Sequence, residues 1–287
     1  MSEVLVGNVV LAAVLTFVTQ AIQIGAYSAR YAGVITGRVA TAISLFSLLV
    51  VASRLASLFM TPSLGVVADA TTNAAVKGHL TTVGPAALHL FDTQMRVVVA
   101  AGSFGTLLGG LLLPMFLLMF VRGIGAFERL GSVPHALLRL FDARVLADLL
   151  RALKPRAFRL RDFPIDAVPR TLLIANTLLF AVYSVGVVAA YYASVIVLDA
   201  RTTATGLSGL VNGIGTIAFS LFVDPTTAFI VDQTVRGERP RRDVQAMIFW
   251  LVVSAFVGTV LAQLILAPSA HYIAAVAHFW VGLSSKH

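Results

Sequence analysis

The sequence lacks cysteine entirely and has few charged residues. Because none of the 287 residues is cysteine, disulfides, thiolate metal sites and cysteine nucleophiles are excluded. Only 12% of the residues are charged, whereas 58% are hydrophobic. The HExxH, P-loop and GxSxG motifs are missing, as is any cluster of carboxylates suited to a metal. We therefore predict no catalytic residues, no metal site and no cofactor, and an enzyme is disfavoured.

The sequence is rich in long apolar runs. Runs of about 20 or more residues recur, which is the length needed to cross the hydrocarbon core of a bilayer. We predict six transmembrane helices, at residues 4–27, 39–61, 97–121, 171–198, 207–231 and 244–266. A last apolar stretch, 272–283, is too short to span and is expected to lie at the membrane interface or to re-enter the membrane. The predicted fold class is an all-α polytopic membrane protein.

The formal net charge of +8 does not indicate nucleic acid binding, because of where the basic residues lie. Ten of the 21 Lys and Arg residues fall within 122–170 and four within 236–242, on the same side of the predicted membrane as Arg30 and Arg38. Four lie on the other side: Lys77, Arg96, Arg201 and Lys286. By the positive-inside rule, this asymmetry places the basic loop in the cytoplasm and both termini outside.

The basic loop at 122–170 has a pattern of its own. Its apolar residues recur every four positions and are opposed by Arg and Asp; they are Leu137, Phe141, Val145, Leu149 and Leu153. The pattern predicts an amphipathic helix at the membrane interface, ended by Pro155. Its charge favours anionic membrane lipids as partners. A direct role in recruiting an anionic lipid substrate is the alternative.

Two stretches of the chain repeat in the same order. SLFMTPSLGVVAD at 57–69 is echoed by SLFVDPTTAFIVD at 220–232, and GTLLGGLLLP at 105–114 by GTVLAQLILAP at 258–268. Since each half holds three predicted spans, the second copy must enter the membrane upside down, as in many transporters. We predict two inverted three-helix repeats, at 1–121 and 171–268, with the basic loop 122–170 between them and an interfacial tail at 269–287. Chance similarity in a chain so rich in Leu, Gly and Ala is the alternative.

Polar residues inside the predicted spans are candidates for a functional site. Gln20, Gln23, Tyr27 and Arg30 follow one helical face. Arg54 lies within the second span, where a charged group costs at least about 2.5 kcal/mol near mid-membrane. We interpret Arg54 as an anion contact on a translocation path. The alternative is an arginine that reaches back to the outer interface.

Proline and acidic residues recur at the ends of the repeated segments. Pro62 and Pro225 each remove a backbone donor and are expected to break their helices. Asp224 is predicted to cap or coordinate a cation at such a break, or to pair with a neighbouring helix. Asp69 and Asp232 are expected to end helices.

Small and amide residues predict how the spans pack together. The spacings Gly105-xxx-Gly109 and Gly209-xxx-Gly213 are typical of closely approaching membrane helices. The side chains of Asn176, Asn212 and Gln263 are predicted to form hydrogen bonds between helices.

Several of these residues fall in a distinctive segment of the chain. It contains Ala26-Tyr27-Ser28, Arg30, Ala32-Gly33, Thr36-Gly37-Arg38, Ala40, Ser44-Leu45-Phe46 and Ser53-Arg54. This segment resembles the Amj family, the alternate lipid II flippases of bacteria, and Asn212-Gly213 with Asp224-Pro225 and Asp232 is similar to the family's second half. The resemblance implies that the protein moves lipid II, the undecaprenyl-pyrophosphate-linked disaccharide pentapeptide, to the outer leaflet for peptidoglycan synthesis. It also implies functional roles for Tyr27, Arg30, Arg38, Arg54, Asn212, Asp224 and Asp232.

The chemistry of the residues agrees with this implication. An anionic pyrophosphate must cross about 30 Å of hydrocarbon, and the arginine fork suits phosphate geometry. The expected substrate-binding residues are Arg54, Arg30, Arg38, Tyr27, Gln20, Gln23 and Asn212, and the residues expected in coupling or at helix breaks are Asp224, Asp232 and Asp69. We expect alternating access, with Arg30 and Arg38 at the cytoplasmic entrance and Arg54 near the exit. A polyprenyl-pyrophosphate phosphatase, a transporter of another polyprenyl-linked lipid and a membrane scaffold stay open as alternatives.

Overall fold

The part of the chain that can be described is helical throughout. The structure, a computed structural model, describes residues 3–130 and 163–284, apart from a few side chains that include those of Arg54 and Asn212. Every long element in these ranges is an α-helix, and they hold no strand. The all-α prediction is therefore confirmed. The amphipathic helix predicted at 137–153 lies outside the described residues.

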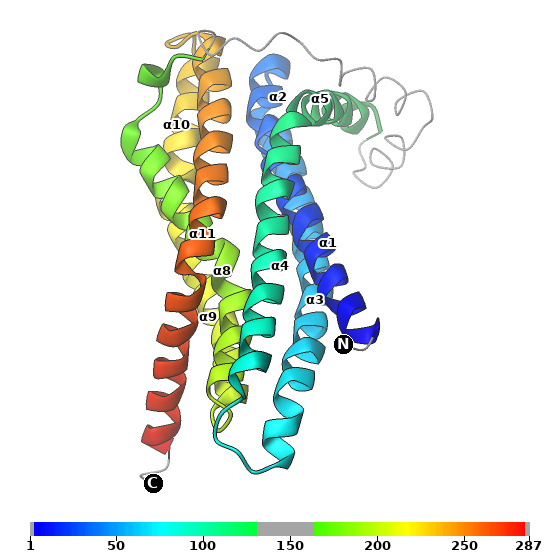
Figure 1. Cartoon of the computed structure of the whole chain (residues 1–287). Helices are drawn as coiled ribbons and strands as arrows, with labels where there is room; N and C mark the ends of the chain where they lie inside the picture. Colours follow the sequence, from blue (N-terminus) through cyan, green and yellow to red (C-terminus); the bar gives the residue numbers. More distant parts are fainter. Residues whose placement is uncertain (1–2, 131–162, 285–287) are drawn as a thin grey trace.

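The first half of the chain crosses the bundle three times (Figure 1). Helix α1 (Glu3–Gly25) leads through a short turn into α2 (Ser28–Thr36), and α3 (Val39–Lys77) returns to the opposite end. Helix α4 (Pro85–Leu111) comes back beside them and bends by 62° into α5 (Leu113–Leu130), which lies across that end of the bundle.

The second half also crosses three times, in the opposite sense (Figure 1). A short 3₁₀ turn, η2 (Ile165–Ala167), precedes α8 (Arg170–Ile196), and α9 (Arg201–Phe222) returns and continues as α10 (Asp224–Val235). Helix α11 (Arg241–Ser284) then runs the full length of the bundle. Because α2, α5 and the α10–α11 turn lie at one end, the described basic residues of 30–38, 122–129 and 236–242 gather there, and we call it the basic end.

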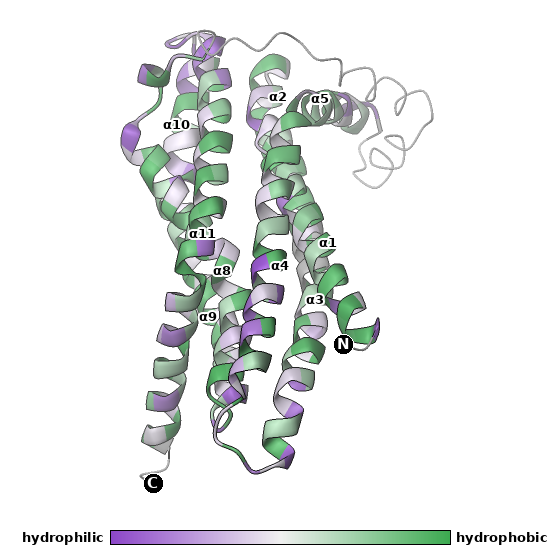
Figure 2. Ribbon diagram, in the orientation of Figure 1, coloured by the Kyte–Doolittle hydropathy of each residue, from purple (hydrophilic) through white to green (hydrophobic). Residues whose placement is uncertain are grey.

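Hydropathy and length together indicate a membrane protein. Within the described residues, four helical segments are long and apolar enough to span a bilayer, or five if α4 and α5 form one bent span. Figure 2 shows hydrophobic residues covering most of the bundle, with hydrophilic ones at the basic end and along the lower parts of α4 and α11. At 1.5 Å per residue the 44-residue α11 is about 66 Å long. Since the hydrocarbon core is only about 30 Å thick, α11 must project well beyond it.

The third predicted span and the predicted proline breaks are corrected by the structure. The span predicted at 97–121 is bent, because α4 ends at Leu111 and the chain continues in a new direction as α5. Pro62 lies inside the continuous α3, so it does not break its helix, whereas α9 does end just before Asp224-Pro225. A proline in the first turn of α10 lacks only an N–H that would be unpaired there anyway. Residues 269–284 continue α11 rather than forming a separate element.

Glycines let the first and third helices of each half approach closely. A Cβ added to Gly105 of α4 would overlap the backbone of Phe17 in α1, and one added to Gly258 of α11 would overlap the backbone of Thr177 in α8. Close approach is thus confirmed for Gly105 and also for Gly109, whose Cβ would lie 2.5 Å from the Ala21 carbonyl oxygen. It is wrong for Gly209-xxx-Gly213, where an added Cβ meets nothing within 4 Å. Sequence spacing identifies a small face on a helix but not whether another helix covers it.

Candidate functional site

A row of side-chain hydrogen bonds joins the two halves of the protein. The donors lie on α1 and in the turn that follows it, and the acceptors lie on α8, which runs in the opposite direction to α1. The bonds join Gln20 Nε2 to Ser184 Oγ (3.2 Å), Gln23 Nε2 to Tyr183 OH (3.4 Å), and Tyr27 OH to Asn176 Oδ1 (3.3 Å). We call this row the seam. Its bonds pass through side chains rather than close backbone contacts, so the two halves are held together by polar groups along this line.

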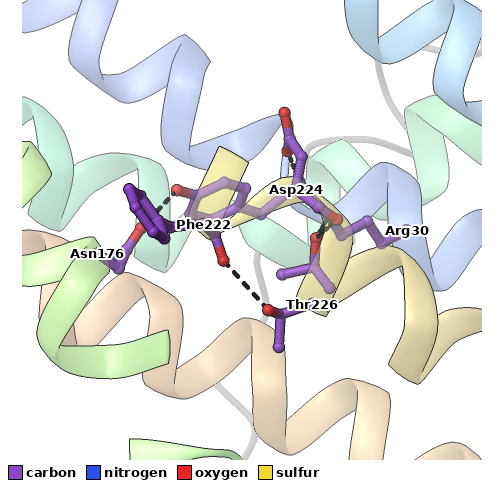
Figure 3. Close-up of polar contacts among 7 residues, drawn as sticks. Arg30, Asn176, Phe222, Asp224 and Thr226 are labelled. Atoms are coloured by element: carbon purple, nitrogen blue, oxygen red, sulfur yellow. Dashed lines mark hydrogen bonds and ion pairs between the residues drawn. The ribbon is translucent and has the colours of Figure 1, made fainter. Parts of the chain in front are cut away.

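An ion pair lies at the basic end of the seam. Arg30 of α2 donates from Nη2 to Asp224 Oδ1 at 2.9 Å and from Nε to Thr227 Oγ1 at 3.2 Å, both on α10 (Figure 3). Its guanidinium carbon also lies 5.1 Å from the ring centres of both Tyr27 and Phe46. The Arg30 side chain is 11% exposed and that of Asp224 is 44% exposed. Among the described residues, Nη1 of Arg30 is buried without a hydrogen-bond partner, so the guanidinium keeps an unused donor.

The break between α9 and α10 explains why Asp224 is at this position. Val223 is buried at the break, and Asp224 opens α10 with Pro225 behind it. Thr226 Oγ1 donates to the Phe222 carbonyl at 3.1 Å, as Figure 3 shows, and thus satisfies an acceptor at the break. The Asp224 carboxylate, at the first turn of a helix, also benefits from the positive end of the helix dipole.

Two adjacent cavities follow the seam. The larger, of about 280 Å³, is lined by uncharged polar groups together with Met60, Val187, Val188 and Gly213; the polar groups are Thr16, Thr19, Gln20, Tyr183, Ser184 and Thr216. The smaller, of about 140 Å³, reaches Gln23, Tyr27 and Asp224 near the ion pair. Both are lined by Tyr183 and Thr216, so they adjoin, and we call the two together the cleft; α1 and α8 form its floor, and α3 and α9 its walls.

The walls of this cleft are apart from each other. Helix α3 packs on α1, and α9 packs on α8, but α3 and α9 hardly touch within the described residues. Exposed apolar side chains stand beside residues that line the cleft: Phe59 (69% exposed) precedes Met60 on α3, and Ile217 (62% exposed) follows Thr216 on α9. The cleft is therefore flanked on α3 and α9 by exposed apolar side chains.

The structure brings together only some of the predicted site residues. Gln20, Gln23 and Tyr27, which were predicted to share one helical face with Arg30, line the cleft, and Arg30 lies next to it through its ion pair with Asp224. Arg38 lies outside it and pairs with Glu128 of α5, with both side chains largely exposed. The predicted contacts of Arg54 and Asn212 concern side chains that lie outside the described residues.

The structure agrees with the predictions for Asp224 and Asp232 but not with the one for Asp69. Asp224 is paired with Arg30, which confirms the interpretation that it pairs with a neighbouring helix. Asp232 lies in the last turn of α10, close to the expected helix end. Asp69 does not end a helix, because α3 continues to Lys77 with Pro62 and Asp69 inside it.

The interhelical amide bonds were predicted correctly where they can be described. Asn176 Nδ2 donates to the Leu251 carbonyl at 2.9 Å and to Ser254 Oγ at 2.8 Å, which fixes α8 to α11. Gln263 Nε2 donates to the Arg96 carbonyl at 3.0 Å, and Arg96 Nη1 returns a bond of 3.0 Å to the Gln263 carbonyl. Such bonds lock helices together in lipid.

Several cleft residues were missed by the sequence analysis. Thr16, Thr19, Tyr183, Ser184 and Thr216 are single hydroxyl residues in apolar runs, where each alone is unremarkable. A usable signal does exist in their spacing. Thr16, Thr19 and Gln20 fall on the helical face that continues to Gln23 and Tyr27.

The fold and the cleft together define a multi-pass α-helical membrane protein with a polar cleft between two helical halves. Within the described residues no group of three or more His, Cys, Asp or Glu side chains is arranged to hold a metal. A family model described as "Alternate to MurJ" matches residues 15–277, so the chain belongs to the Amj family, as its resemblance suggested.

A curated relative supports the same assignment. The chain is 32% identical over 251 residues to a protein of Bacillus subtilis (strain 168) named "Lipid II flippase Amj", an alignment that covers 87% of this chain and 89% of the relative. No solved structure matches the chain at a significant level.

Proposed function

We propose that this protein is a lipid II flippase, which moves the undecaprenyl-pyrophosphate-linked peptidoglycan precursor from the inner to the outer leaflet of the bacterial cytoplasmic membrane. The observation that carries the proposal is a polar cleft between two helical halves with a buried arginine at its basic end. An ionisable side chain buried within membrane helices marks a functional site by default. Membership of the Amj family and the name of the Bacillus relative support lipid II as the substrate.

The cleft suits a lipid with a large polar headgroup. Its floor offers hydroxyl and amide groups, while the walls carry exposed apolar side chains on α3 and α9. A headgroup enters between the walls, and the prenyl chain stays in the bilayer, so the hydrocarbon tail never crosses a polar surface. The proposed activity is transport rather than catalysis.

Arg30 is the proposed pyrophosphate contact. Its Nη1 is buried without a partner among the described residues, and its other donors hold Asp224 and Thr227. A phosphate offers oxygens in the fork geometry that guanidinium prefers, so it can take Nη1 and displace the partly exposed Asp224 carboxylate. Displacement separates α10 from α2, which links substrate binding to movement at the basic end. Asp224 thereby becomes the coupling residue, and Arg38 a first electrostatic contact outside the cleft.

Alternating access follows from the two halves being inverted repeats. The repeated glycines support this relation: Gly105 and Gly258 both make the tight contact between the third and first helices of their half. Thr106 and Thr259, which follow them, are both fully buried. The basic end lies in the cytoplasm and both termini lie outside, and the basic loop contacts anionic lipids rather than nucleic acid.

Complementation with a flip assay tests the proposal. The chain is expressed in a bacterium depleted of its own lipid II flippases, and lipid II exposed on the outer leaflet is measured with an externally added enzyme that cleaves it. Accessibility should return with the wild-type chain and be lost with Arg30→Gln. Arg236→Gln is the matched control, because Arg236 lies at the same end but is 59% exposed and pairs with Glu238 on the surface.

The same assay separates the alternatives. No accessibility from a correctly inserted wild-type chain overturns the lipid II assignment. Release of phosphate from undecaprenyl pyrophosphate by the purified protein would show a phosphatase instead.

A further inference from the structure

The two cavities of the cleft differ in chemistry. The smaller one reaches the ion pair through Asp224 and Tyr27, whereas the larger is lined, in the described residues, by uncharged side chains alone. An anion binds more favourably beside the Arg30 guanidinium than among the hydroxyl and amide groups of the larger cavity. The larger cavity is therefore a site for a different, uncharged part of the ligand.

The larger cavity offers hydrogen-bonding groups of both senses. Glutamine, serine, threonine and tyrosine each donate and accept, and so do the hydroxyl and acylamino groups of a sugar. Val187, Val188 and Met60 supply apolar surface in the same cavity, which suits the C–H face of a sugar ring. Small-molecule sites usually have a mostly apolar lining with a small number of polar groups that point toward the ligand.

Gln20 supplies an independent sign that a ligand belongs here. Its side chain is only 4% exposed, and its Nε2 donates to Ser184 Oγ, yet its Oε1 is buried without a partner among the described residues. A buried acceptor left unpaired costs about 1–3 kcal/mol. A sugar hydroxyl or acylamino N–H in the adjacent cavity would satisfy it.

The size of the cavity limits what it takes. Its volume of about 280 Å³ lies just below the usual range for small-molecule sites, roughly 300–1,000 Å³. It therefore holds one ring-sized group and not a disaccharide with its peptide. In a polyprenyl-pyrophosphate lipid, the group covalently next to the pyrophosphate is the first sugar, and the two cavities adjoin at Tyr183 and Thr216.

We infer that the larger cavity is a saccharide subsite that recognises the pyrophosphate-linked sugar of the carried lipid, with Gln20 and Ser184 as its specificity-determining residues. The inference rests on the proposed function, and it adds that the protein distinguishes a glycosylated lipid from bare undecaprenyl pyrophosphate. A site built to hydrogen-bond a substrate group discriminates strongly against the analogue that lacks it.

Binding of two lipids to the purified full-length protein in nanodiscs tests this inference. Dissociation constants are measured for lipid II and for undecaprenyl pyrophosphate, and the readout is their ratio. The wild type should bind lipid II about tenfold more tightly, since one net hydrogen bond to a ligand is worth up to about a factor of ten. Gln20→Leu and the smaller change Ser184→Ala should each reduce the ratio severalfold, mainly by weakening lipid II binding.

Gln263→Leu is the matched control, because it removes an interhelical glutamine of the bundle that lies outside the cleft. Its ratio should equal that of the wild type. If the wild type binds both lipids equally, or if the cleft variants weaken both lipids by the same factor, the saccharide subsite is refuted while the flippase proposal stands. If the wild type binds neither lipid, the proposed function fails and the subsite fails with it.

Discussion

Exchanging the two charges of the Arg30–Asp224 pair separates a structural role from a substrate-binding role. In the single variant Arg30→Asp, two acidic side chains face each other across α2 and α10. In the double variant Arg30→Asp/Asp224→Arg the ion pair is restored, but the guanidinium now projects from α10 instead of α2. The pairing is the same, and only the position of the positive charge differs.

The contacts in the structure set the expected magnitudes. A charge-assisted hydrogen bond contributes about 1.5–3 kcal/mol, and the 44% exposure of Asp224 places this one near the lower limit. The rings of Tyr27 and Phe46, each 5.1 Å from the guanidinium carbon, add about 0.5–1 kcal/mol each. Loss of Arg30 should therefore remove about 3 kcal/mol of stabilisation, and the exchange should restore about half of it, since the ring contacts are not recovered.

Thermal unfolding measures the structural role of Arg30, and lipid II accessibility measures its role in substrate binding. The midpoint of thermal unfolding in detergent should fall in Arg30→Asp and recover partly in the double variant. Lipid II accessibility in flippase-depleted cells should be lost in both, because a pyrophosphate that loses a charge-assisted hydrogen bond of about 1.5–3 kcal/mol binds roughly ten- to a hundredfold more weakly. Wild-type transport by the double variant would refute the reasoning, since Arg30 would then serve only to pair with Asp224.

Three further changes test the framework around the site. Gly105→Val should separate α1 from α4 and destabilise the protein by about 1–3 kcal/mol or more, whereas Gly209→Val, which meets open space, should leave the unfolding midpoint unchanged. Asn176→Leu removes three side-chain hydrogen bonds at a fully buried position; it should lower the unfolding midpoint by an amount equivalent to about 1–2 kcal/mol, and a midpoint equal to the wild type would contradict its role in fixing α8 to α11. Gly37→Ala places a side chain at a φ of 70° in the turn before α3 and should cost about 1 kcal/mol, measured by the same thermal assay, while Gly84→Ala, at a φ of −60°, should cost much less.

Hydropathy and helical spacing predicted the parts of this protein that depend on the chain's own periodicity. The apolar runs predicted the all-helical class. Of the four residues predicted to share one helical face, Gln20, Gln23 and Tyr27 line the cleft and Arg30 pairs with Asp224 beside it. Pairing of Asp224 with a neighbouring helix was also foreseen as an option, because an acidic side chain in a membrane segment needs a partner.

Contacts between residues on different helices could not be predicted from the sequence in the same way. The two Gly-xxx-Gly spacings look alike in sequence, yet Gly105 and Gly109 meet a neighbouring helix whereas Gly209 and Gly213 do not, because the packing of α4 against α1 is set by the whole bundle. The bend at Leu112 lies inside a long apolar run, so hydropathy predicted a span there but not its bend. The role of Ser184 and Tyr183 as hydrogen-bond acceptors for Gln20 and Gln23 is visible only once α8 is placed opposite α1.

The tight glycine contacts also bear on how the protein is made. They join the first helix of each half to the third: Phe17 contacts Gly105 in the first half, and Thr177 contacts Gly258 in the second. Each of these two contacts is therefore made within a single half. The ribosome has therefore finished both partners of the first contact before it begins the second half. At about 5–20 residues per second, translation of the loop between α5 and η2 takes a few seconds. The first half thus has time to assemble in the membrane as a unit, and it then presents Gln20, Gln23 and Tyr27 as a surface on which the second half closes.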